Sequence, residues 1–317
     1  MEVKFWGTRG SLPASITSNQ IEMKLNKILE LLSEKKSITY SDLKNIISTA
    51  QFSVSKAYGT NTSCVQIDDG NKENYIILDA GTGLRDFGNY IMKNTNIKIN
   101  KTFHIFISHT HWDHIHGFPF FTPAYIPGNK IIIYGVHNEL EKNFETQQSQ
   151  PFFPISLKMM AAEKKFIQLS NKEKYNISGY EISIIEQNHP GKSYGYSFIK
   201  NGKKIVYSTD AEHKEEVIGS EFIEFFRNSD LMIFDAQYTL VDSEYIKCDW
   251  GHSSNFLAVE FASLSNTKHL VMFHSEPSRE DFELDKILGD TKKYAQHFIK
   301  NNNLKISQAY DSMLIEI

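Results

Sequence analysis

The segment 108–117, S-H-T-H-W-D-H-I-H-G, crowds potential metal ligands into a short stretch. Within six residues it holds His109, His111, Asp113 and His114. Neutral imidazoles and carboxylates are the groups with which proteins bind zinc and similar divalent ions. Because His109 and His111 project together while the other two lie past a turn, this spacing can supply two ions. A histidine-rich surface loop is the alternative interpretation, and ligands elsewhere in the chain must decide between the two.

Three further ligand-type side chains stand just after strand-like stretches. They are His189 after 181–185, Asp210 after 204–207 and His274 after 269–273. The segment 103–107, before the histidine motif, has the same alternating apolar pattern. A strand end is rigid, whereas the loop that follows can turn side chains toward a common point outside the sheet. We therefore expect these loops to gather the ligands, and a single carboxylate such as Asp210 can bridge two cations.

Other polar residues at element ends are candidates for supporting roles. Asp79 ends a strand-like run. It is expected to hold a ligand histidine, because metal-bound imidazoles nearly always donate their other N–H to a carboxylate or carbonyl. His252 stands at a helix entrance, which Ser253 or Ser254 can cap. Two roles stay open for Arg9, a bidentate phosphate contact and a structural ion pair.

The residues of about 15–57 change to a helical pattern. Apolar side chains recur at helical spacing over 21–32, and a second, shorter pattern follows a start at Thr39 that is rich in capping side chains. Asn19 with Glu22 is expected to cap the first helix. We interpret both helices as an insertion in a parent domain. Its apolar stripe is expected to pack on that domain, with a dimer contact or a cover over the active site as alternatives, and a homodimer is predicted.

The composition indicates the broad class of protein. The chain has 317 residues, 40% of them hydrophobic, a formal net charge of −4 and a sequence pI of about 6.3. These values are typical of a soluble globular protein, and they argue against a long nucleic acid or an anionic membrane as partner. No apolar run is long enough to span a membrane and no signal-peptide core is present, so a cytoplasmic location is expected. Cys64 and Cys248 are too few for a disulfide scaffold or a cysteine zinc site.

Several later motifs make the pattern specific. They are G-T-R-G-S-L-P (7–13), Y-G-T-N-T-S-C (58–64), L-D-A-G-T-G (78–83), D-A-Q-Y (235–238), W-G-H-S-S (250–254) and F-H-S-E-P (273–277). With the ligand spacing, they resemble the metallo-β-lactamase superfamily, and within it the ribonuclease Z-related branch, particularly its small cyclic-nucleotide phosphodiesterases. The resemblance covers nearly the whole chain except the insertion. It implies a single α/β (α+β) domain over 1–317, folded as an αββα four-layer sandwich with a dinuclear site at one edge.

The resemblance also assigns roles by position. His109, His111 and His189 would hold a first metal, Asp113, His114 and His274 a second, and Asp210 would bridge them. About two divalent ions per chain are implied, zinc or else manganese. His252 matches a histidine beside the scissile phosphate that is not a ligand, and Asp235 is expected to brace a ligand or the His252 loop. The insertion and His116 depart from the usual pattern of the branch, and neither removes a ligand.

The implied activity is that of a metal-dependent phosphodiesterase, which hydrolyses 3′,5′-cyclic nucleotides through a metal-bridging hydroxide. Asp113 is expected to orient the attacking water or accept its proton, and His252 to stabilise developing charge or protonate the leaving oxygen. The alternatives are a tRNA 3′-end processing endoribonuclease of the ribonuclease Z type, another hydrolase of the superfamily, and a non-catalytic binding protein. The acidic net charge and the absence of a basic, glycine-rich arm favour a small nucleotide substrate.

Overall fold

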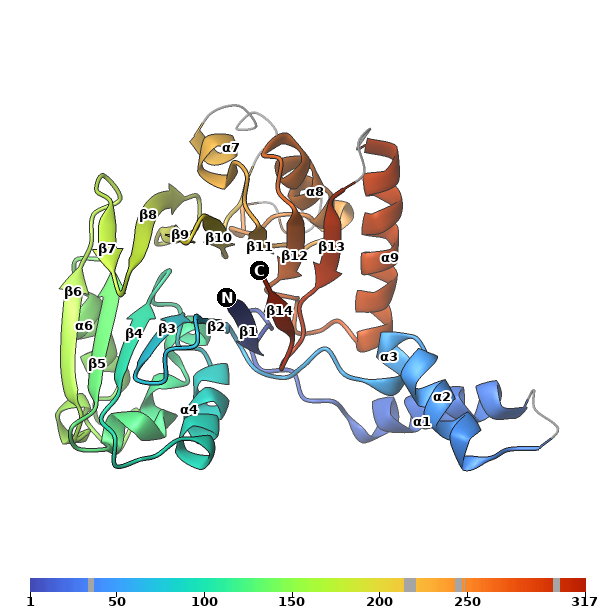
Figure 1. Ribbon diagram of the computed structural model, residues 1–317, viewed down its shortest axis with the longest axis horizontal. Helices are drawn as coiled ribbons and strands as arrows, with labels where there is room; N and C mark the ends of the chain where they lie inside the picture. Colours follow the sequence, from blue (N-terminus) through green and yellow to red (C-terminus); the bar gives the residue numbers. More distant parts are fainter. Residues whose placement is uncertain (34–36, 214–220, 243–246, 248, 299–302) are drawn as a thin grey trace.

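The structure, a computed structural model, describes residues 1–317 apart from 34–36, 214–220, 243–246, 248 and 299–302. Its described strands form two seven-stranded sheets that face each other, and helices cover the outer face of each sheet (Figure 1). This arrangement is the αββα sandwich that the sequence predicts. Cys64 is buried as a free thiol, whereas Cys248 lies outside the described residues.

The first sheet combines antiparallel and parallel pairs. Its order is β14 (Leu314–Glu316), β1 (Glu2–Gly7), β2 (Cys64–Asp68), β3 (Asn74–Leu78), β4 (Thr102–Phe106), β5 (Lys130–Gly135) and β6 (Glu163–Gln168). From β3 to β6 the strands are parallel, and Leu78 at the end of β3 pairs with Phe106 at the end of β4. The loops that follow these two strands therefore start side by side, one at Asp79 and the other at Ile107.

The second sheet also combines antiparallel and parallel pairs. Its order is β13 (Lys305–Gln308), β12 (His269–Phe273), β11 (Leu231–Asp235), β10 (Lys203–Ser208), β9 (Ser193–Lys200), β8 (Tyr180–Gln187) and β7 (Tyr175–Ile177). Strands β10 to β13 are parallel, whereas β8 and β9 form an antiparallel hairpin. The loops after β10 and β12 and the β8–β9 turn thus open on one edge, and they carry Asp210, His274 and His189.

Helices flank both sheets. Over the first sheet lie α4 (Gly83–Asn94), α5 (Trp112–Ile115) and α6 (Leu140–Gln147), with the short 3-10 helices η1 (Phe118–Phe120), η2 (Thr122–Tyr125) and η3 (Leu157–Met159). Over the second lie α7 (Glu221–Phe226), α8 (Asn255–Leu264) and α9 (Asp281–Phe298) (Figure 1). Among the described residues, no helix is both long and apolar enough to cross a membrane.

Apolar strands supply three cores because successive side chains point to opposite faces. In β10, Ile205 and Tyr207 pack between the sheets while Val206 packs under the outer helices. In β4, Ile105 faces the helices over the first sheet and Phe106 faces the opposite sheet. The strand-like runs found in the sequence are apolar at nearly every position for this reason.

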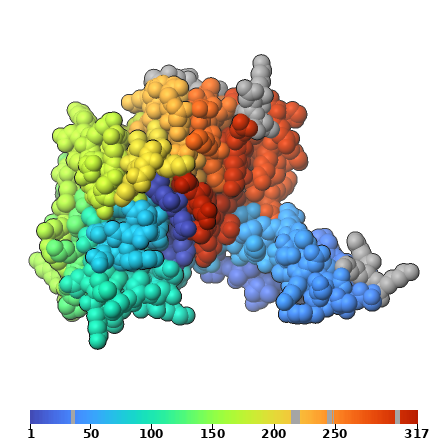
Figure 2. Space-filling view, in the orientation of Figure 1, coloured from blue at the N-terminus to red at the C-terminus, as the bar shows by residue number. Residues whose placement is uncertain are grey.

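The segment expected to be an insertion contains α1 (Ser18–Ser33), α2 (Tyr40–Thr49) and α3 (Phe52–Ser55). These helices stand out from the two-sheet body (Figure 2). The expectation that the apolar stripe packs on the parent domain is wrong for most of α1: Ile21, Leu25 and Leu29 are 46%, 56% and 61% exposed. Two expectations stay predictions. One is that the segment is an insertion within one domain, and the other is that the protein is a homodimer.

The caps of the two helices differ in how well the sequence predicts them. At α2 the helix start rich in capping side chains is as expected, and Thr39 and Asp42 form a capping box there. At α1 the box uses Thr17 and Gln20, each of which accepts a hydrogen bond from the other's backbone N–H. The pair Asn19 and Glu22 is therefore wrong, because the helix begins one residue before Asn19.

A buried charge network ties the base of α1 to α9. The Lys24 ammonium donates to the Asp281 carboxylate at 2.7 Å and is only 9% exposed. Arg9 approaches the same carboxylate at 3.7 Å and donates to the carbonyls of Gly59 and Arg279 at 3.0 and 2.9 Å. Of the two roles left open for Arg9, the structure shows the structural one.

A buried histidine in the second helical layer makes stability depend on pH. His213 packs against the rings of Phe222, Phe234 and Phe261, and burial lowers its pKa to about 3. Between pH 6.5 and pH 3 the unfolded chain binds a proton at this position that the folded chain does not. Folding stability should therefore fall as the pH falls, by about 1.4 kcal/mol per pH unit from this residue.

His213→Phe should remove that contribution. Urea unfolding of the metal-free protein at pH 6.5 and pH 4.5 should show a loss of stability that is smaller by roughly 2–3 kcal/mol in the variant than in the parent. His297→Phe, at an exposed position of α9, is the matched control. Equal losses in the parent and in His213→Phe would contradict the prediction.

Candidate metal centre

The histidine motif lies on the loop after β4 and on the short helix α5. His109 is buried and His111, the residue before α5, is exposed. Asp113 and His114, within α5, are both buried. The turn between the two pairs sends them into two separate groups of side chains, as the spacing predicts.

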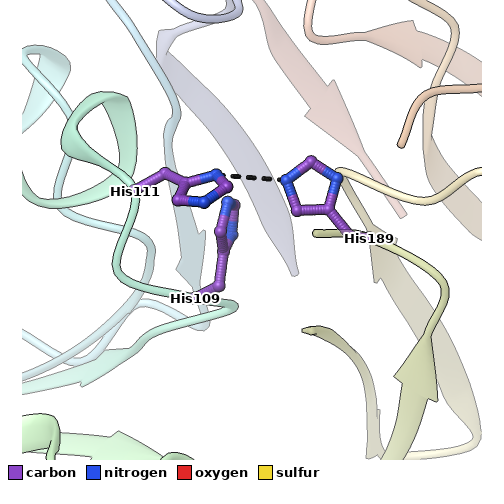
Figure 3. A group of neighbouring side chains, drawn as sticks. All are labelled: His109, His111 and His189. Carbon is purple, nitrogen blue, oxygen red and sulfur yellow. Dashed lines mark hydrogen bonds between the residues drawn. The ribbon is translucent and has the colours of Figure 1, made fainter. Parts of the chain in front are cut away.

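The first group consists of His109, His111 and His189, whose ligand atoms lie within 4.8 Å of one another. Figure 3 shows the three rings converging, with His111 Nδ1 and His189 Nε2 3.1 Å apart. His189 Nδ1 lies 2.9 Å from the carbonyl oxygen of Gly251, which can only accept. Nδ1 therefore carries the proton, and the Nε2 lone pair of the neutral ring faces the group.

The second group consists of Asp113, His114, Asp210 and His274, again within 4.8 Å. His114 Nε2 lies 3.2 Å from the Asp113 carboxylate and 3.3 Å from His274 Nε2. His274 Nε2 also lies 3.1 Å from Asp113. Carboxylates and imidazole nitrogens that converge on one point are the donor set of a divalent cation.

Asp210 stands between the two groups. Its Oδ1 lies 3.1 Å from His114 and 3.2 Å from His274, whereas its Oδ2 lies 3.7 Å from both His109 and His189. One carboxylate oxygen thus faces each group. This is the placement that a bridging ligand requires.

The protonation preferences of these residues test whether the site fits cations. Burial lowers the pKa of His109 well below its usual range, so the ring is neutral, and its buried Nε2 has no hydrogen-bond partner. Burial opposes the charge of Asp210, yet His114, His274 and His109 hold its pKa well below the usual range. Burial likewise opposes a charge on His114, yet Asp210, Asp113 and Asp79 raise its pKa well above the usual range. The ionised carboxylates of the second group thus favour a positive charge between them. The residues of both groups therefore fit divalent ions.

Asp79 holds His114, one of the expected ligand histidines, as the sequence predicts. Its Oδ2 accepts from His114 Nδ1 at 2.7 Å, so if an ion displaces the second proton, the lone pair of the neutral ring would lie on Nε2, which faces the second group. The carboxylate also accepts from the Ser108 backbone N–H at 2.7 Å and from the Tyr207 hydroxyl at 2.7 Å. Sequence reasoning missed Ser108 and Tyr207. Ser108 precedes His109 directly, but nothing in the strand containing Tyr207 signals this contact.

Three of the polar residues that follow strands adopt left-handed backbone conformations. The φ angles are 57° at Asp79, 52° at Asp210 and 62° at His274. Such angles are uncommon for residues other than glycine, and they cluster where a structure needs a particular side-chain direction. Each of the three residues turns the chain sharply after its strand; Asp210 and His274 reach the second group, whereas Asp79 reaches His114 from behind.

His252 lies beside both groups and is held by a carboxylate. Its Nδ1 lies 2.8 Å from Asp235 Oδ2, and its ring stacks on that of His274 at a centroid distance of 5.2 Å. Burial opposes the charge, yet Asp235, Asp210 and Asp113 raise the pKa of His252 to about 9. Asp235 therefore braces His252 rather than a member of either group. The Ser254 hydroxyl caps the helix that follows by accepting from the Leu257 N–H.

Comparison with known proteins gives one family match and several likenesses. A family model described as "Beta-lactamase superfamily domain" matches residues 74–275, which include all seven expected ligands. Ribonuclease Z of Prochlorococcus marinus (strain AS9601) is 27% identical over 281 residues, covering 72% of this chain and 86% of that protein.

Two solved structures share the fold over the whole chain. The short form of human tRNase Z has a TM-score of 0.59 at 19% identity and covers 100% of this chain and 99% of its own. Yeast PDE1 has a TM-score of 0.63 at 15% identity, with the same coverage of 100% and 99%. At these identities the likeness shows the fold alone.

These relatives correct the expected partner. The acidic net charge predicts a small nucleotide and no long nucleic acid, and this prediction is wrong: relatives that match most of the chain are ribonucleases Z, and a tRNase Z shares the fold. The net charge of −4 misled because it sums the whole surface. A ligand at the centre responds instead to the local field, to which His252, and divalent ions when bound, would contribute most.

Proposed function

The chain belongs to the beta-lactamase superfamily, and from this premise we propose that it is a metal-dependent endoribonuclease of the ribonuclease Z type, which cleaves a phosphodiester bond near the 3′ end of tRNA precursors. The ribonuclease Z relatives support the substrate class. The observation that carries the chemistry is Asp210, whose two carboxylate oxygens each face one group of ligands.

The donor set supports zinc at both positions. Five imidazoles and two carboxylates suit zinc, although manganese accepts the same groups. When bound, such ions would neutralise charge on a phosphoryl oxygen and lower the pKa of a coordinated water. His109, His111 and His189 would hold one ion, Asp113, His114 and His274 the other, and Asp210 both.

The chain's own residues supply the remaining chemistry. Asp113 would orient the attacking water or take its proton, since its Oδ2 lies at the second group and is fixed by the Ser11 backbone N–H at 2.8 Å. His252, with its proton on Nδ1 directed at Asp235, presents Nε2 to the phosphate. It would stabilise the charge that builds during in-line attack or protonate the leaving oxygen.

Hydrolysis of 3′,5′-cyclic nucleotides, the activity first expected from the sequence, has weaker support. The likeness to yeast PDE1 is at 15% identity and carries only the fold. The ribonuclease Z relatives reach 27% identity across most of the chain.

The test compares substrates on the metal-reconstituted protein. A tRNA precursor with a 3′ trailer, cAMP and cGMP would be assayed side by side, each with and without a chelator. We expect cleavage of the precursor at one position, chelator-sensitive, with a kcat/KM well above that for either cyclic nucleotide. A higher kcat/KM for a cyclic nucleotide would overturn the proposal.

A further inference from the structure

Beside the ligand groups lies an open pocket that the proposed chemistry does not use. It has a volume of about 570 Å³, and its walls include Trp112, Phe120, Phe152 and Phe153. Two of these rings are unusually exposed for aromatic side chains, Trp112 at 78% and Phe152 at 76%. We refer to it as the aromatic pocket.

The aromatic pocket and the ligand groups share one segment of chain. His109 and His111 belong to the first ligand group, whereas Thr110 and Trp112 line the pocket. Within the next turn, Asp113 and His114 enter the second group while Ile115 and His116 line the pocket. The same short stretch therefore forms a wall of both, and Trp112 lies one residue from a ligand on either side.

The opposite walls are held in place by packing and hydrogen bonds. Phe120 and Phe153 meet edge to face with ring centroids 5.6 Å apart. Asn143 of α6 donates to the Thr110 hydroxyl at 3.0 Å, and Gln147 donates to the Ile115 carbonyl at 3.0 Å. These bonds join α6 to the ligand segment, so the pocket does not depend on a neighbouring molecule for its shape.

We infer that the aromatic pocket is a stacking subsite for one unpaired base of the RNA strand whose phosphate lies at the ligand groups. This inference rests on the proposed function. Exposed aromatic faces bind bases of any sequence, because every base has a π-face. Among the described residues that line the pocket, His116 is the one with a titratable side chain, so the pocket suits the neutral base of a nucleotide rather than its phosphate. Because the pocket and the ligand groups share the segment 109–116, that base would lie close to the cleaved bond.

Cleavage kinetics test the subsite by combining protein variants with an altered substrate, in the manner of a double-mutant cycle. Trp112→Ala and Phe152→Ala, both at exposed positions, should lower kcat/KM on a tRNA precursor roughly 5- to 100-fold, and Trp112→Phe should restore most of it. Phe298→Ala, at an exposed aromatic of α9, is the matched control. Replacing one nucleotide near the cleaved bond by an abasic one should lower the parent's rate similarly, and Trp112→Ala should then add little.

Binding gives a second readout that needs no cleavage. Trp6 is buried at 7% exposure, so in a Trp250→Phe background Trp112 is the exposed tryptophan. A short unpaired RNA should quench its fluorescence, and the abasic analogue should quench less. If RNA is cleaved but neither the abasic substrate nor Trp112→Ala changes the rate, the subsite is overturned and the proposed function stands. If RNA quenches Trp112 in a base-dependent way but is never cleaved, the subsite stands and the proposed function fails. If neither occurs, both fail.

Discussion

Asp210→Asn should bind fewer divalent ions than the parent and should lose RNA cleavage by roughly 10³-fold or more. The parent, reconstituted with zinc, should hold about two ions per chain, because the described donors exceed what one tetrahedral site needs. Asp210 is the residue whose two oxygens face both groups, at 3.1–3.2 Å on one side and 3.7 Å on the other. Removing its charge should weaken the binding of an ion at both groups.

Asparagine is the informative replacement because of the backbone. Asp210 has a φ of 52°, a conformation that asparagine tolerates and alanine resists. A loss of metal in Asp210→Asn therefore reports the missing charge, whereas Asp210→Ala would add backbone strain. Asp290→Asn, on the surface of α9, is the control for a lost carboxylate.

Elemental analysis and precursor cleavage measure the two effects on the same samples. The bridging assignment is wrong if Asp210→Asn keeps the parental metal content. A parent that takes up one ion however much metal is supplied would remove the dinuclear assignment altogether. Circular dichroism of both proteins shows whether a loss of metal follows from a loss of fold.

That the expected ligand side chains gather in the fold could be predicted, because the sequence shows which of them follow strands. His109, Asp210 and His274 each follow an apolar run, and parallel strands place the ends of such runs at one edge. The sequence could not show that Asp210 turns one oxygen to each group, since this depends on its left-handed backbone conformation. Nor could it place the Tyr207 hydroxyl on Asp79, a contact made across 128 residues of chain.

The errors have physical causes as well. Apolar residues at helical spacing in α1 predicted a stripe packed against the domain. Periodicity shows that one face of a helix is apolar, but it does not show what covers that face. Leu29 is 61% exposed. The net charge predicted a small substrate because a sum over 317 residues contains no information on where the charges lie. The Phe152–Phe153 pair can be read from the sequence as core or as a wall of the cleft, but its partnership with Trp112 cannot, because Trp112 and Phe152 lie 40 positions apart and line one pocket only in the fold.

His252→Ala should keep both metal ions while RNA cleavage falls by roughly 10²-fold or more, the scale of a lost general acid or charge stabiliser. The ring is oriented through Nδ1 by Asp235, which is itself fixed by the backbone N–H groups of Ala211 and Gln237 at 3.2 and 3.0 Å. Asp235→Asn should therefore cause a smaller loss of the same kind, since it leaves the ring in place but removes the charge behind it.

Metal analysis separates this role from a role in binding the ions. His252 lies within 4.8 Å of ligand atoms of His189 and Asp210, so position alone would also allow it to bind metal. If His252→Ala loses an ion, His252 is a ligand and its assignment to the reaction is wrong. If the variant keeps both ions and cleaves at the parental rate, the residue has neither role. Full metal content with slow cleavage, and a kcat that falls while KM holds, is the combination that only a group acting on the reacting phosphate produces.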